Sequence, residues 1–464
     1  MRIAIIGAGF SGCQLAIELM RNGPSPLDIS LFDASSSFGP GVAFSARHDR
    51  LLLNTRAANM SALATDPTHF LRWLWANDLP EHPAAAIPPS GHAFVARGVY
   101  GRYLSDVLDA AEAAAPHDVS LNRIGRRVVG LTDQHGVLWL KLDDDSTCVA
   151  DVAVLCIGNL PPRLPAAPGG DACRGPRLIA NPWDEASIGR IQPSDAVLVL
   201  GSGLTMVDVA ILLADRGHRG PILALSRHGL LPMEHAPTRK APPSAWMDGL
   251  PTARGLLRQI RLEIARSERA GVDWRAVLDA WRDRVPLLWH RLPMIERRRF
   301  LRHLRPIWDI HRHRMAPEIA SQIKEMQASG QLEIRAGTIE AYQAGQDGVA
   351  VRFRNRGSKI EVRVVGDWLV NCAGPALDFR HVHEPLIHDL LARGLVRPEP
   401  LGLGLETTRG LQLVGWNGQP NGSLFALGPL TRGTFWETTG VPEIREQGRA
   451  LARRLAMNGT ARAA

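Results

Sequence analysis

The chain has 464 residues, of which 45% are hydrophobic and 6% aromatic, and its formal net charge is +8. This composition is typical of a globular protein of two or three domains, and no apolar run approaches the roughly 18 residues that a membrane span needs. Met1 and Arg2 lead directly into an apolar segment, which argues against a signal peptide.

The five cysteines are scattered along the chain, and no two of them form a Cys-x-x-Cys pair. This spacing disfavours a disulfide framework and a thiol-reductase centre, and the simplest setting for such a chain is the reducing cytoplasm. The cysteines are Cys13, Cys148, Cys156, Cys173 and Cys372.

The first motif follows residues 3–6, an apolar run that predicts a buried strand, and it reads Gly-Ala-Gly-Phe-Ser-Gly. In such a turn the first glycine allows the bend, the second lets the backbone approach a pyrophosphate, and the third lets the helix pack on the strand. The next predicted strand, residues 28–33, ends in an acid about 20 residues after the glycines, where a partner for ribose hydroxyls is expected. A glycine-rich turn could be merely a turn, but together these features predict a dinucleotide site at Gly7, Gly9, Ser11, Gly12 and Asp33.

The same pattern of strand, glycine turn and helix returns after residues 197–200. Gly201, Gly203 and Thr205 are candidate cofactor contacts, but Met206 replaces the third glycine, so we expect helix and strand to lie further apart here. This second site is therefore less completely specified than the first.

The strand expected next, residues 221–225, ends in Ser226, Arg227 and His228, without an acid. A carboxylate would repel a 2′-phosphate, whereas a guanidinium suits its oxygens, so we predict NADPH as the second cofactor and Arg227 as its contact. The alternative is that Arg227 is a solvated charge at a strand end.

Each dinucleotide unit is expected to close with a strand in which Asp, Cys and Gly recur at the same spacing. We count the final glycine of each strand among the candidate cofactor-binding residues. Two dinucleotide sites in one chain suggest electron transfer from one cofactor to the other. The matching residues are Asp151, Cys156 and Gly158 in the first unit and Asp367, Cys372 and Gly374 in the second.

Residues 251–315 contain sixteen Arg, no Lys and seven acids, so this segment carries a net charge of +9. Apolar spacings of three and four predict several helices, with tryptophans in the core and solvated basic faces. Nucleic-acid binding is disfavoured because no recognition motif accompanies the arginines, whereas an Arg-lined cleft for an anionic substrate stays open. His311 and His313 are two apart and fall on different helix faces, so we expect no metal site.

The order of motifs predicts an α/β fold with two Rossmann-like dinucleotide-binding domains of three-layer ββα type, the second inserted in the first. In the first unit we expect a helix around residues 70–75 and a strand meander over residues 119–158. The predicted domains are residues 1–160 with 375–464 for FAD, residues 161–250 with 316–374 for NAD(P)H, and residues 251–315 as a helical insertion.

This order resembles flavoproteins that bind FAD in the first domain and NAD(P)H in the second. Residues 301–315 and 428–437 resemble a bacterial FAD/NAD(P)-binding family, distantly similar to single-component flavin monooxygenases. The resemblance implies pyrophosphate contacts at the first glycine turn and a ribose contact at Asp33. It also implies adenine near Val128, a flavin-side loop with Asn54 and residues 57–59, and Gly428 at the ribityl chain.

Some relatives are marked by the linker Phe-x-Gly-x-x-x-His-x-x-x-Trp or Tyr. Residues 173–183 keep Gly175 and Trp183 but lack the Phe and the His, which disfavours Baeyer–Villiger oxidation and leaves N-hydroxylation or another oxygenation open. Trp183 could equally be a packing residue under the interdomain linker.

We favour an FAD-dependent, NADPH-using monooxygenase acting on a small polar or anionic molecule. The alternatives are an NAD(P)H-dependent reductase or oxidase with a non-thiol acceptor and a non-catalytic flavin-binding sensor. No catalytic residue is assigned, because in such enzymes the cofactor carries the chemistry. Candidate groups near the flavin are Asn54, Arg432, Thr434 and Glu437.

Overall fold

The computed structural model describes residues 1–77, 79, 87–165, 175–239 and 251–463, with side chains up to residue 457. Cys173 and residues 240–250, expected to end the first part of the second unit, lie outside these ranges. The first two positions of the linker pattern, residues 173–174, lie outside them as well.

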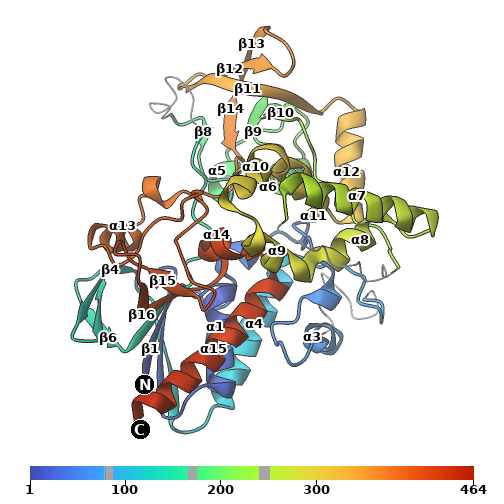
Figure 1. The fold of residues 1–464 in the computed structure, drawn as a ribbon. Helices are drawn as coiled ribbons and strands as arrows, with labels where there is room; N and C mark the ends of the chain where they lie inside the picture. The colour runs from blue at the N-terminus through green and yellow to red at the C-terminus, as the bar shows by residue number, and fades with distance from the viewer. Residues whose placement is uncertain (78, 80–86, 166–174, 240–250, 464) are drawn as a thin grey trace.

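The first sheet combines strands from both ends of the chain, and Figure 1 shows the two termini close together beside it. Its strands are short apolar runs, and all four residues of the central strand β7 are buried, as expected for a parallel sheet covered on both faces. Only β15 runs antiparallel to its neighbour. The order is β15 (Gln412–Val414), β16 (Pro420–Ala426), β7 (Val152–Leu155), β1 (Arg2–Ile6), β2 (Leu27–Phe32) and β3 (Val119–Ile124).

Helices cover one face of this sheet, and a small antiparallel sheet covers the other, so the first unit has three layers. One core cluster lies under the helices α1 (Phe10–Asn22), α4 (Arg97–Ala113) and α15 (Val441–Ala463). A second core cluster lies under the small sheet and the helix α13. The covering elements are β4 (Val128–Gln134), β5 (Val137–Leu142), β6 (Thr147–Ala150) and α13 (Pro385–Ala392).

The strand meander expected over residues 119–158 is divided between two sheets. β3 pairs in parallel with β2 along its full length and extends the first sheet, whereas β4, β5 and β6 form the separate antiparallel sheet. The prediction of one continuous meander was therefore wrong, because β3 has a parallel partner 92 residues earlier in the sequence, at Leu27↔Val119.

The second sheet lies between the two sequence segments of the first, which confirms the predicted insertion of one dinucleotide unit in the other. One core cluster lies under α6 (Leu204–Asp215) and α12 (Pro317–Ala328) on one face. Its strand order is β13 (Glu361–Gly366), β12 (Val349–Asn355), β11 (Leu332–Ala344), β10 (Ile222–Ser226), β9 (Val197–Leu200), β14 (Trp368–Asn371) and β8 (Leu178–Ile179).

The strand β11 takes part in two kinds of pairing. Residues 332–336 pair in parallel with β10, and residues 337–344 pair antiparallel with β12. The resulting ribbon of β11, β12 and β13 packs apolar side chains such as Val351 and Phe353 against Leu200 and Leu369 of the central strands. The third layer is thus continuous with the sheet here, whereas in the first unit it is separate.

The matching Asp and Cys of the two closing strands have the same structural tasks. Asp151 accepts a hydrogen bond from the N–H of Arg2 at 2.8 Å, and Asp367 accepts one from the N–H of Ala196 at 2.7 Å, so each aspartate aligns the start of the neighbouring strand. The N–H of each cysteine then donates to the last residue of that strand. The repeat is therefore a repeat of sheet geometry.

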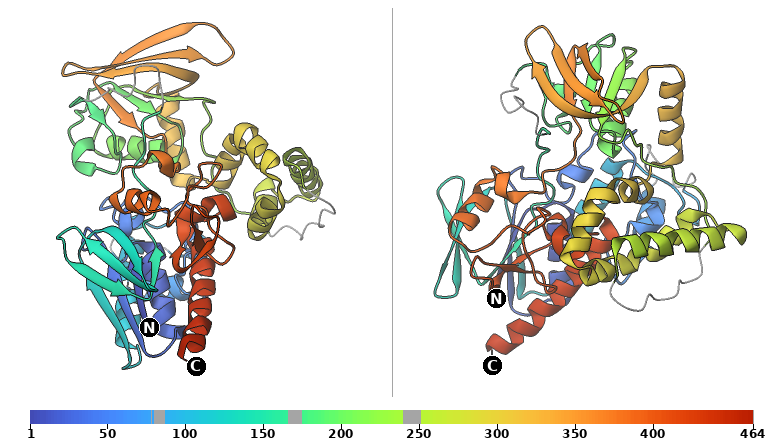
Figure 2. Two further views of the ribbon diagram at one scale, coloured as in Figure 1. Left: turned by 60° about the vertical axis from the view of Figure 1, so that its left-hand side comes forward. Right: turned by 45° about the horizontal axis from the view of Figure 1, so that its top comes forward.

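Residues 253–312 form five helices that project to one side of both sheets, as Figure 2 shows. Trp281 and Trp289 are buried, as expected, but the basic faces are not all solvated. The side chains of Arg275 and Arg314 are buried as well, which corrects the expected picture. The helices are α7 (Ala253–Arg269), α8 (Trp274–Trp281), α9 (Val285–Arg291), α10 (Met294–His303) and α11 (Arg305–Arg312).

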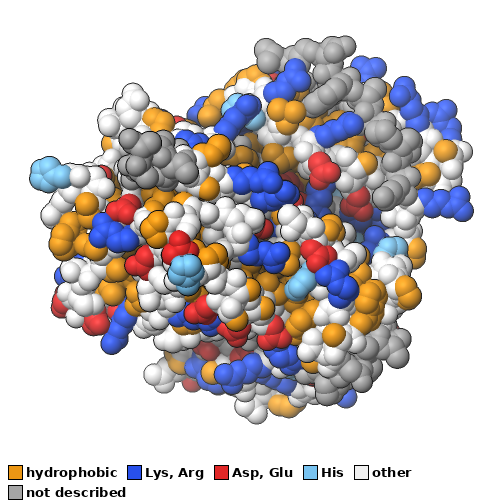
Figure 3. All heavy atoms as spheres, turned by 90° about the horizontal axis from the view of Figure 1, so that it is seen from below, with side chains coloured by type: hydrophobic (Ala, Val, Ile, Leu, Met, Phe, Trp, Pro, Cys, Tyr) orange, Lys and Arg blue, Asp and Glu red, His pale blue; other side chains and the backbone are white. Residues whose placement is uncertain are grey.

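Short elements connect these layers, and the helix expected around residues 70–75 is α3. On the face seen in Figure 3, acidic side chains lie among the basic ones. No helix in the described ranges is long and apolar enough to cross a membrane. The short elements are α2 (Gly41–Phe44), η1 (Ala57–Asn59), α3 (His69–Asn77), α5 (Glu185–Ile188), η4 (Arg282–Arg284), η5 (Phe379–His381), η6 (Gly428–Thr431) and α14 (Arg432–Phe435).

Candidate active site

The first glycine turn has the geometry that a pyrophosphate needs. Gly7 has φ +105°, and a Cβ atom there would lie 2.5 Å from the carbonyl oxygen of Cys156. A Cβ atom on Gly12 would lie 1.9 Å from the carbonyl oxygen of Gly7, so neither position tolerates a side chain. α1 begins after Gly9 without a capping side chain, which leaves its first N–H groups free to bind phosphate oxygens.

Asp33 lies at this turn, directly after β2. One of its carboxylate oxygens accepts a hydrogen bond from the N–H of Ala8 at 3.0 Å, and the other accepts from the N–H of Ser35 at 2.9 Å. The carboxylate is therefore fixed against the glycine turn. Oδ1 also accepts from the hydroxyl of Ser35 at 2.5 Å, so about one of the four acceptor positions of the carboxylate remains for a ribose hydroxyl.

Ser11 and Gly428, more than 400 residues apart, come together at the start of α1. Gly428 has φ +78°, and a Cβ atom there would lie 2.5 Å from Oγ of Ser11. Gly158, with φ +70°, follows β7 beside the same turn. Val128 starts β4 with its side chain 2% exposed in the core, so only its backbone could contact adenine. That contact stays a prediction.

A segment that sequence reasoning missed also lies over the first turn. The N–H of Gly39 donates to the carbonyl of Ala8 at 2.9 Å. Gly41 has φ +53°, and its Cα is 3.3 Å from where a Cβ atom on Gly9 would lie. The available signal was the run Gly39-Pro40-Gly41, since two glycines so close together often mark a close backbone approach.

The second turn repeats the first in part. Gly201 has φ +114°, and a Cβ atom there would lie 2.3 Å from the carbonyl oxygen of Cys372. α6 also begins without a capping side chain, and a Cβ atom on Gly203 would meet nothing within 4 Å. Met206 is fully buried in the core cluster under α6, so its side chain fills the place where a closer helix contact would lie. Thr205 is half-buried in the first turn of the helix.

Arg227 is exposed at the end of β10, beside a second basic group that sequence reasoning missed. Arg356 follows β12 and hydrogen-bonds with the ring Nδ1 of His228. Burial and the two guanidinium groups lower the pKa of His228. Gly374, with φ +88°, ends the neighbouring closing strand. Arg356 could not be found from sequence, because 128 residues separate it from His228.

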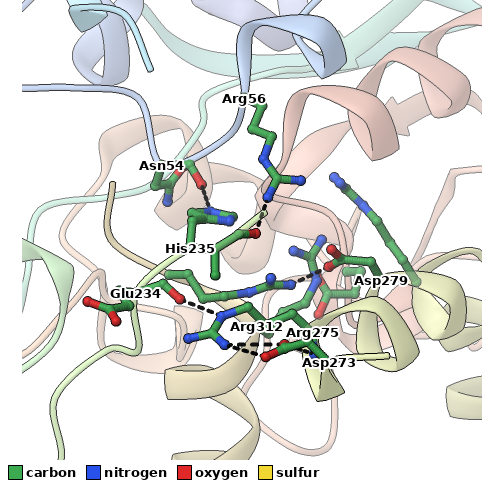
Figure 4. Close-up of polar contacts among 12 residues, drawn as sticks. Asn54, Arg56, Glu234, His235, Asp273, Arg275, Asp279 and Arg312 are labelled. Carbon is green, nitrogen blue, oxygen red and sulfur yellow. Dashed lines mark hydrogen bonds and ion pairs between the residues drawn. The ribbon is translucent and has the colours of Figure 1, made fainter. Parts of the chain in front are cut away.

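The loop of the first unit with Asn54 and Arg56, which we call the flavin-side loop because the resemblance predicts it there, contacts the segment that leads into the helical insertion (Figure 4). The carbonyl of Asn54 accepts a hydrogen bond from Nε2 of His235 at 3.0 Å, and Arg56 donates to the carbonyl of Ala236 at 2.6 Å. Burial, with the nearby charge of Arg314, lowers the pKa of His235 to about 4. The ring is therefore neutral at physiological pH, and its orientation is set by the main chain of the other unit.

Two arginines of the insertion, the buried Arg314 and the half-buried Arg312, lie behind this contact. Arg314 is 1% exposed and pairs with Asp279 through one nitrogen, while its Nε and Nη1 have no hydrogen-bond partner among the described residues. Arg312 lies 3.3 Å from Glu443, and its Nε is 3.6 Å from Glu437 without a hydrogen bond. A buried guanidinium nitrogen without a partner is costly, so the arrangement favours an anion here.

Of the other flavin-side candidates, Thr434 and Glu437 are committed to protein partners. Thr434 Oγ1 bonds to the hydroxyl of Thr407 at 2.8 Å, and Glu437 accepts from Nε1 of Trp308 at 3.0 Å. Arg432 is different, because its Nε has no partner in the described structure and burial lowers its pKa to about 10. Arg432 is therefore the candidate with unused hydrogen-bonding capacity.

Trp436 lies under Arg432 in a strained backbone conformation. Its φ and ψ are 65° and −61°, and the N–H of Glu437 donates to the carbonyl of Phe435 at 2.8 Å. These values describe a γ-turn of the rare, strained kind, and such strain is found most often at functional sites. The guanidinium of Arg432 lies 4.5 Å from the ring centre.

The three buried cysteines of the described ranges are unsuited to redox chemistry. Cys13, Cys156 and Cys372 are buried and unpaired. Burial raises the pKa of Cys13 to about 12 and raises those of Cys156 and Cys372 further, so the reactive thiolate is scarce. No group of three or more His, Cys, Asp or Glu side chains in the described ranges is placed to hold a metal ion.

The sequence model of the FAD-NAD(P)-binding family matches residues 4–160. Residues 4–160 are an FAD/NAD(P)-binding domain. Salicylate hydroxylase from Pseudomonas putida is 25% identical over 197 residues, which cover 38% of this chain and 43% of that protein. An FAD-binding monooxygenase, AusB from Aspergillus calidoustus, is 25% identical over 232 residues. The chain thus spans less than half the length of the curated relatives it matches.

Solved flavoenzymes share the whole architecture. Ornithine hydroxylase from Pseudomonas aeruginosa has a TM-score of 0.65 at 15% identity and covers 98% of both chains. Thioredoxin reductase from T. acidophilum has a TM-score of 0.52 at 11% identity, with 99% of this chain and 98% of that chain covered. The chain therefore has the fold of flavoproteins with two dinucleotide-binding domains. The predicted fold is thus confirmed, and the family match over residues 4–160 supports the predicted binding of FAD and NAD(P).

Proposed function

We propose that this protein is an FAD-dependent, NADPH-using monooxygenase that acts on a small polar substrate carrying negative charge. FAD would occupy the domain formed by residues 1–160 and 375–464, and NADPH the domain formed by residues 161–250 and 316–374. Bound FAD supplies the oxygen-activating chemistry, while the chain binds, orients and shields the reactants. N-hydroxylation of an amine is the reaction to test first.

The observation that carries this proposal is the buried basic site behind the flavin-side loop. Asn54 and His235 join the two dinucleotide units there, and Arg314 brings unpaired guanidinium nitrogens from the helical insertion. An oxygenating flavoenzyme must keep water from the reacting groups, and a site bounded by three parts of the chain can do so. Guanidinium groups also orient a carboxylate or phosphate through paired hydrogen bonds.

Thiol reductases share this fold, so the cysteines bear on the choice between a monooxygenase and a reductase. The sequence has no Cys-x-x-Cys pair, and the three buried cysteines have raised pKa values. A reductase of this chain would need a non-thiol acceptor. The buried arginines favour a bound anionic substrate over direct transfer to a bulky acceptor at the surface.

NADPH is favoured as the hydride donor by the basic group beyond β10. Arg227, His228 and Arg356 converge there, and the sequence places no acid at this strand end. A 2′-phosphate carries negative charge and several acceptor oxygens, so two guanidinium groups suit it better than the hydroxyl of NADH.

Oxygen incorporation decides between oxygenation and reduction. The FAD-loaded protein is given NADPH and ¹⁸O₂ with a panel of amino acids, amines and carboxylates, while NADPH consumption, oxygen uptake and released peroxide are followed. We expect one substrate class to raise NADPH consumption, to lower peroxide release and to yield a product with one labelled oxygen. Rapid reduction of an artificial acceptor, with no label in any product, would establish a reductase or oxidase instead.

Substitutions in the helical insertion test whether the substrate binds there. Arg314→Met should raise the KM of an anionic substrate about tenfold or more, the loss expected for a charge-assisted contact, with FAD content unchanged. Arg302→Met, at an exposed position of the same insertion, should leave the KM unchanged. Equal effects of both substitutions would place the substrate elsewhere.

A further inference from the structure

The helical insertion and Trp436 line a half-open apolar cavity, and no residue of either glycine turn is among its described lining residues. Its volume is about 270 Å³, and sixteen of its eighteen lining residues are apolar. Tryptophans dominate the wall on the side of the first unit. The lining includes Leu257, Ile260, Trp281, Trp289, Trp308 and Trp436.

The helix α7 shows that this space is unfilled. Its apolar residues Leu256, Leu257, Ile260 and Ile264 share one face at spacings of three and four, yet each is only half-buried. A helix of a globular protein normally buries such a stripe, and protein interiors normally pack without voids of this size. They stay half-buried because no side chain of the described residues fills the space in front of them.

The two polar side chains that line the cavity, those of Arg261 and His311, indicate which charge a bound ligand would carry. Arg261 projects from α7 and is exposed. His311 donates from Nδ1 to the carbonyl of Ile307 at 2.7 Å, so Nε2 of the neutral ring is a hydrogen-bond acceptor, and Arg261 is the group that can bind an anion. No acidic residue lines the cavity among the described residues. A basic rim on an apolar chamber fits an apolar molecule with an anionic end.

We propose that this cavity binds a medium-chain carboxylate, with the carboxylate at Arg261 and the chain among the tryptophans. The volume of the cavity limits the chain length of the carboxylate. A dry apolar cavity of about 150 Å³ holds benzene, so a cavity of 270 Å³ accommodates roughly ten non-hydrogen atoms. Acids of eight to ten carbons match this size.

The wall of the cavity contacts the first unit through Trp289, at the segment that we expect near the flavin. Nε1 of Trp289 donates to the carbonyl of Gly433 at 2.8 Å, and the rings of Trp289 and Trp436 stack with centres 4.9 Å apart. Trp436 is the strained residue beside Arg432. The binding site goes beyond the proposed oxygenation, and binding to it requires neither NADPH nor oxygen.

The test uses the FAD-loaded full chain and decanoate as the ligand. Anilinonaphthalene sulfonate, a fluorescent apolar anion, is bound first and displaced by carboxylates of four to twelve carbons. We expect each methylene removed below ten carbons to weaken displacement about fourfold, the ratio expected for burying one CH₂, and no further gain beyond ten. Decanol should bind less tightly than decanoate.

Matched substitutions on α7 distinguish binding in the cavity from binding at the exposed surface of the helix. Leu257→Trp fills the cavity and should weaken decanoate about tenfold or more, whereas Leu262→Trp, on the exposed side at 44% exposure, should have no effect. Arg261→Gln should weaken decanoate about threefold without changing decanol, and the exposed Arg258→Gln should change neither. The FAD spectrum and thermal midpoint verify that each variant is folded.

Three results would overturn this inference. They are failure of millimolar decanoate to displace the dye, displacement that is independent of chain length, and equal effects of Leu257→Trp and Leu262→Trp. A chain that is dimeric in solution and binds dye only after dilution would show that a second copy fills the cavity. Failure of the oxygenation assay has no bearing on these measurements, because they contain no NADPH.

Discussion

Asp33 has two tasks at the first glycine turn, and only one of them concerns the cofactor. It holds the turn through the N–H of Ala8 and is placed to accept a ribose hydroxyl. Asp33→Ala should therefore weaken FAD by on the order of 1.5 to 3 kcal/mol, the value for hydrogen bonds to a charged group. Titration of the apoprotein with FAD, followed by flavin fluorescence, measures the change.

Asp28 offers the control for this substitution, since it lies at the other end of the same strand and accepts from Ser120 and Asn122. Asp28→Ala should leave FAD affinity within about twofold. Equal losses for Asp33→Ala and Asp28→Ala would mean that β2 is disturbed as a whole and that Asp33 has no special contact with ribose. A folded wild type that stays colourless after incubation with FAD would contradict the assignment of this domain's cofactor.

The choice of nicotinamide cofactor depends on two guanidinium groups. Arg227→Ala and Arg356→Ala should each raise the KM for NADPH about tenfold and leave that for NADH nearly unchanged, because only NADPH has a 2′-phosphate to bind. Arg354→Ala is the control, since Arg354 pairs with Glu340 two positions away from Arg356 along the chain. Losses of equal size for both cofactors would show that Arg227 and Arg356 stabilise the sheet end.

Residues fixed by local backbone geometry could be predicted from sequence, and residues fixed by contacts between distant segments could not. Gly7 and Gly201 were predictable because the turn itself requires a positive φ and leaves no room for a Cβ atom. Arg356 and His235 were not, because their positions depend on segments 128 and 181 residues away. The unpaired nitrogens of Arg314 depend on its burial. That burial could not be predicted, because many arginines lie close together in this part of the sequence.

At the scale of elements, the helical insertion is attached to the first unit through the start of α15. Glu443 pairs with Arg282 and lies 3.3 Å from Arg312. Burial raises the pKa of Glu443, but the hydrogen bond and charge of Arg282, with the charge of Arg312, outweigh it and lower the pKa from 4.5 to about 2. The pair thus stabilises the folded state above pH 4.5 by on the order of 3 kcal/mol, and this is lost as the pH falls towards 2.

Glu443→Gln should therefore lower the thermal midpoint at pH 7 and reduce its dependence on pH between 4.5 and 2. Glu446→Gln is the control on the same helix, because the Glu446 side chain is 59% exposed and lies 3.8 Å from Arg445. Melting curves from pH 7 down to pH 3 provide the measurement. A midpoint of Glu443→Gln that falls in parallel with the wild type over this range would mean that Glu443 is not the group that titrates.

Elements whose partners lie next in the sequence were predicted well, and elements that change partners were not. The strands β1 and β9 were predicted correctly because each is an apolar run beside a glycine turn, and β2 because its apolar residues alternate with polar ones before Asp33. β3 was misplaced because its half-exposed sequence resembles an edge of the meander, while its partner is β2. β11 continues past its parallel partner into a hairpin, and no residue pattern marks that change.

At the scale of the whole molecule, the two dinucleotide units are joined by an ion pair with little exposure. Arg97 at the start of α4 holds both oxygens of Asp208 on α6, at 2.8 and 3.0 Å, and its Nε donates to the carbonyl of Leu52 at 3.1 Å. The ring of Trp183, which is 37% exposed, lies 5.8 Å from the guanidinium of Arg97. The pair fixes how the second glycine turn faces the first unit.

The last prediction concerns this pair. Burial raises the pKa of Asp208 even though Arg97 opposes the rise, so desolvation offsets much of the attraction between the two charges. Arg97→Met alone should destabilise the contact between the units by about 3 to 5 kcal/mol, because it leaves Asp208 buried without a partner, and Arg97→Met with Asp208→Leu should recover most of that loss. Arg335→Met, in an exposed pair with Glu333, should cost at most about 1 kcal/mol.

Thermal unfolding is followed by circular dichroism and by release of flavin fluorescence. In Arg97→Met the circular dichroism transition should begin before FAD is released, whereas in the wild type and the double variant the two should coincide. Coincident transitions in Arg97→Met would mean that other contacts, such as His235 with Asn54, hold the units together.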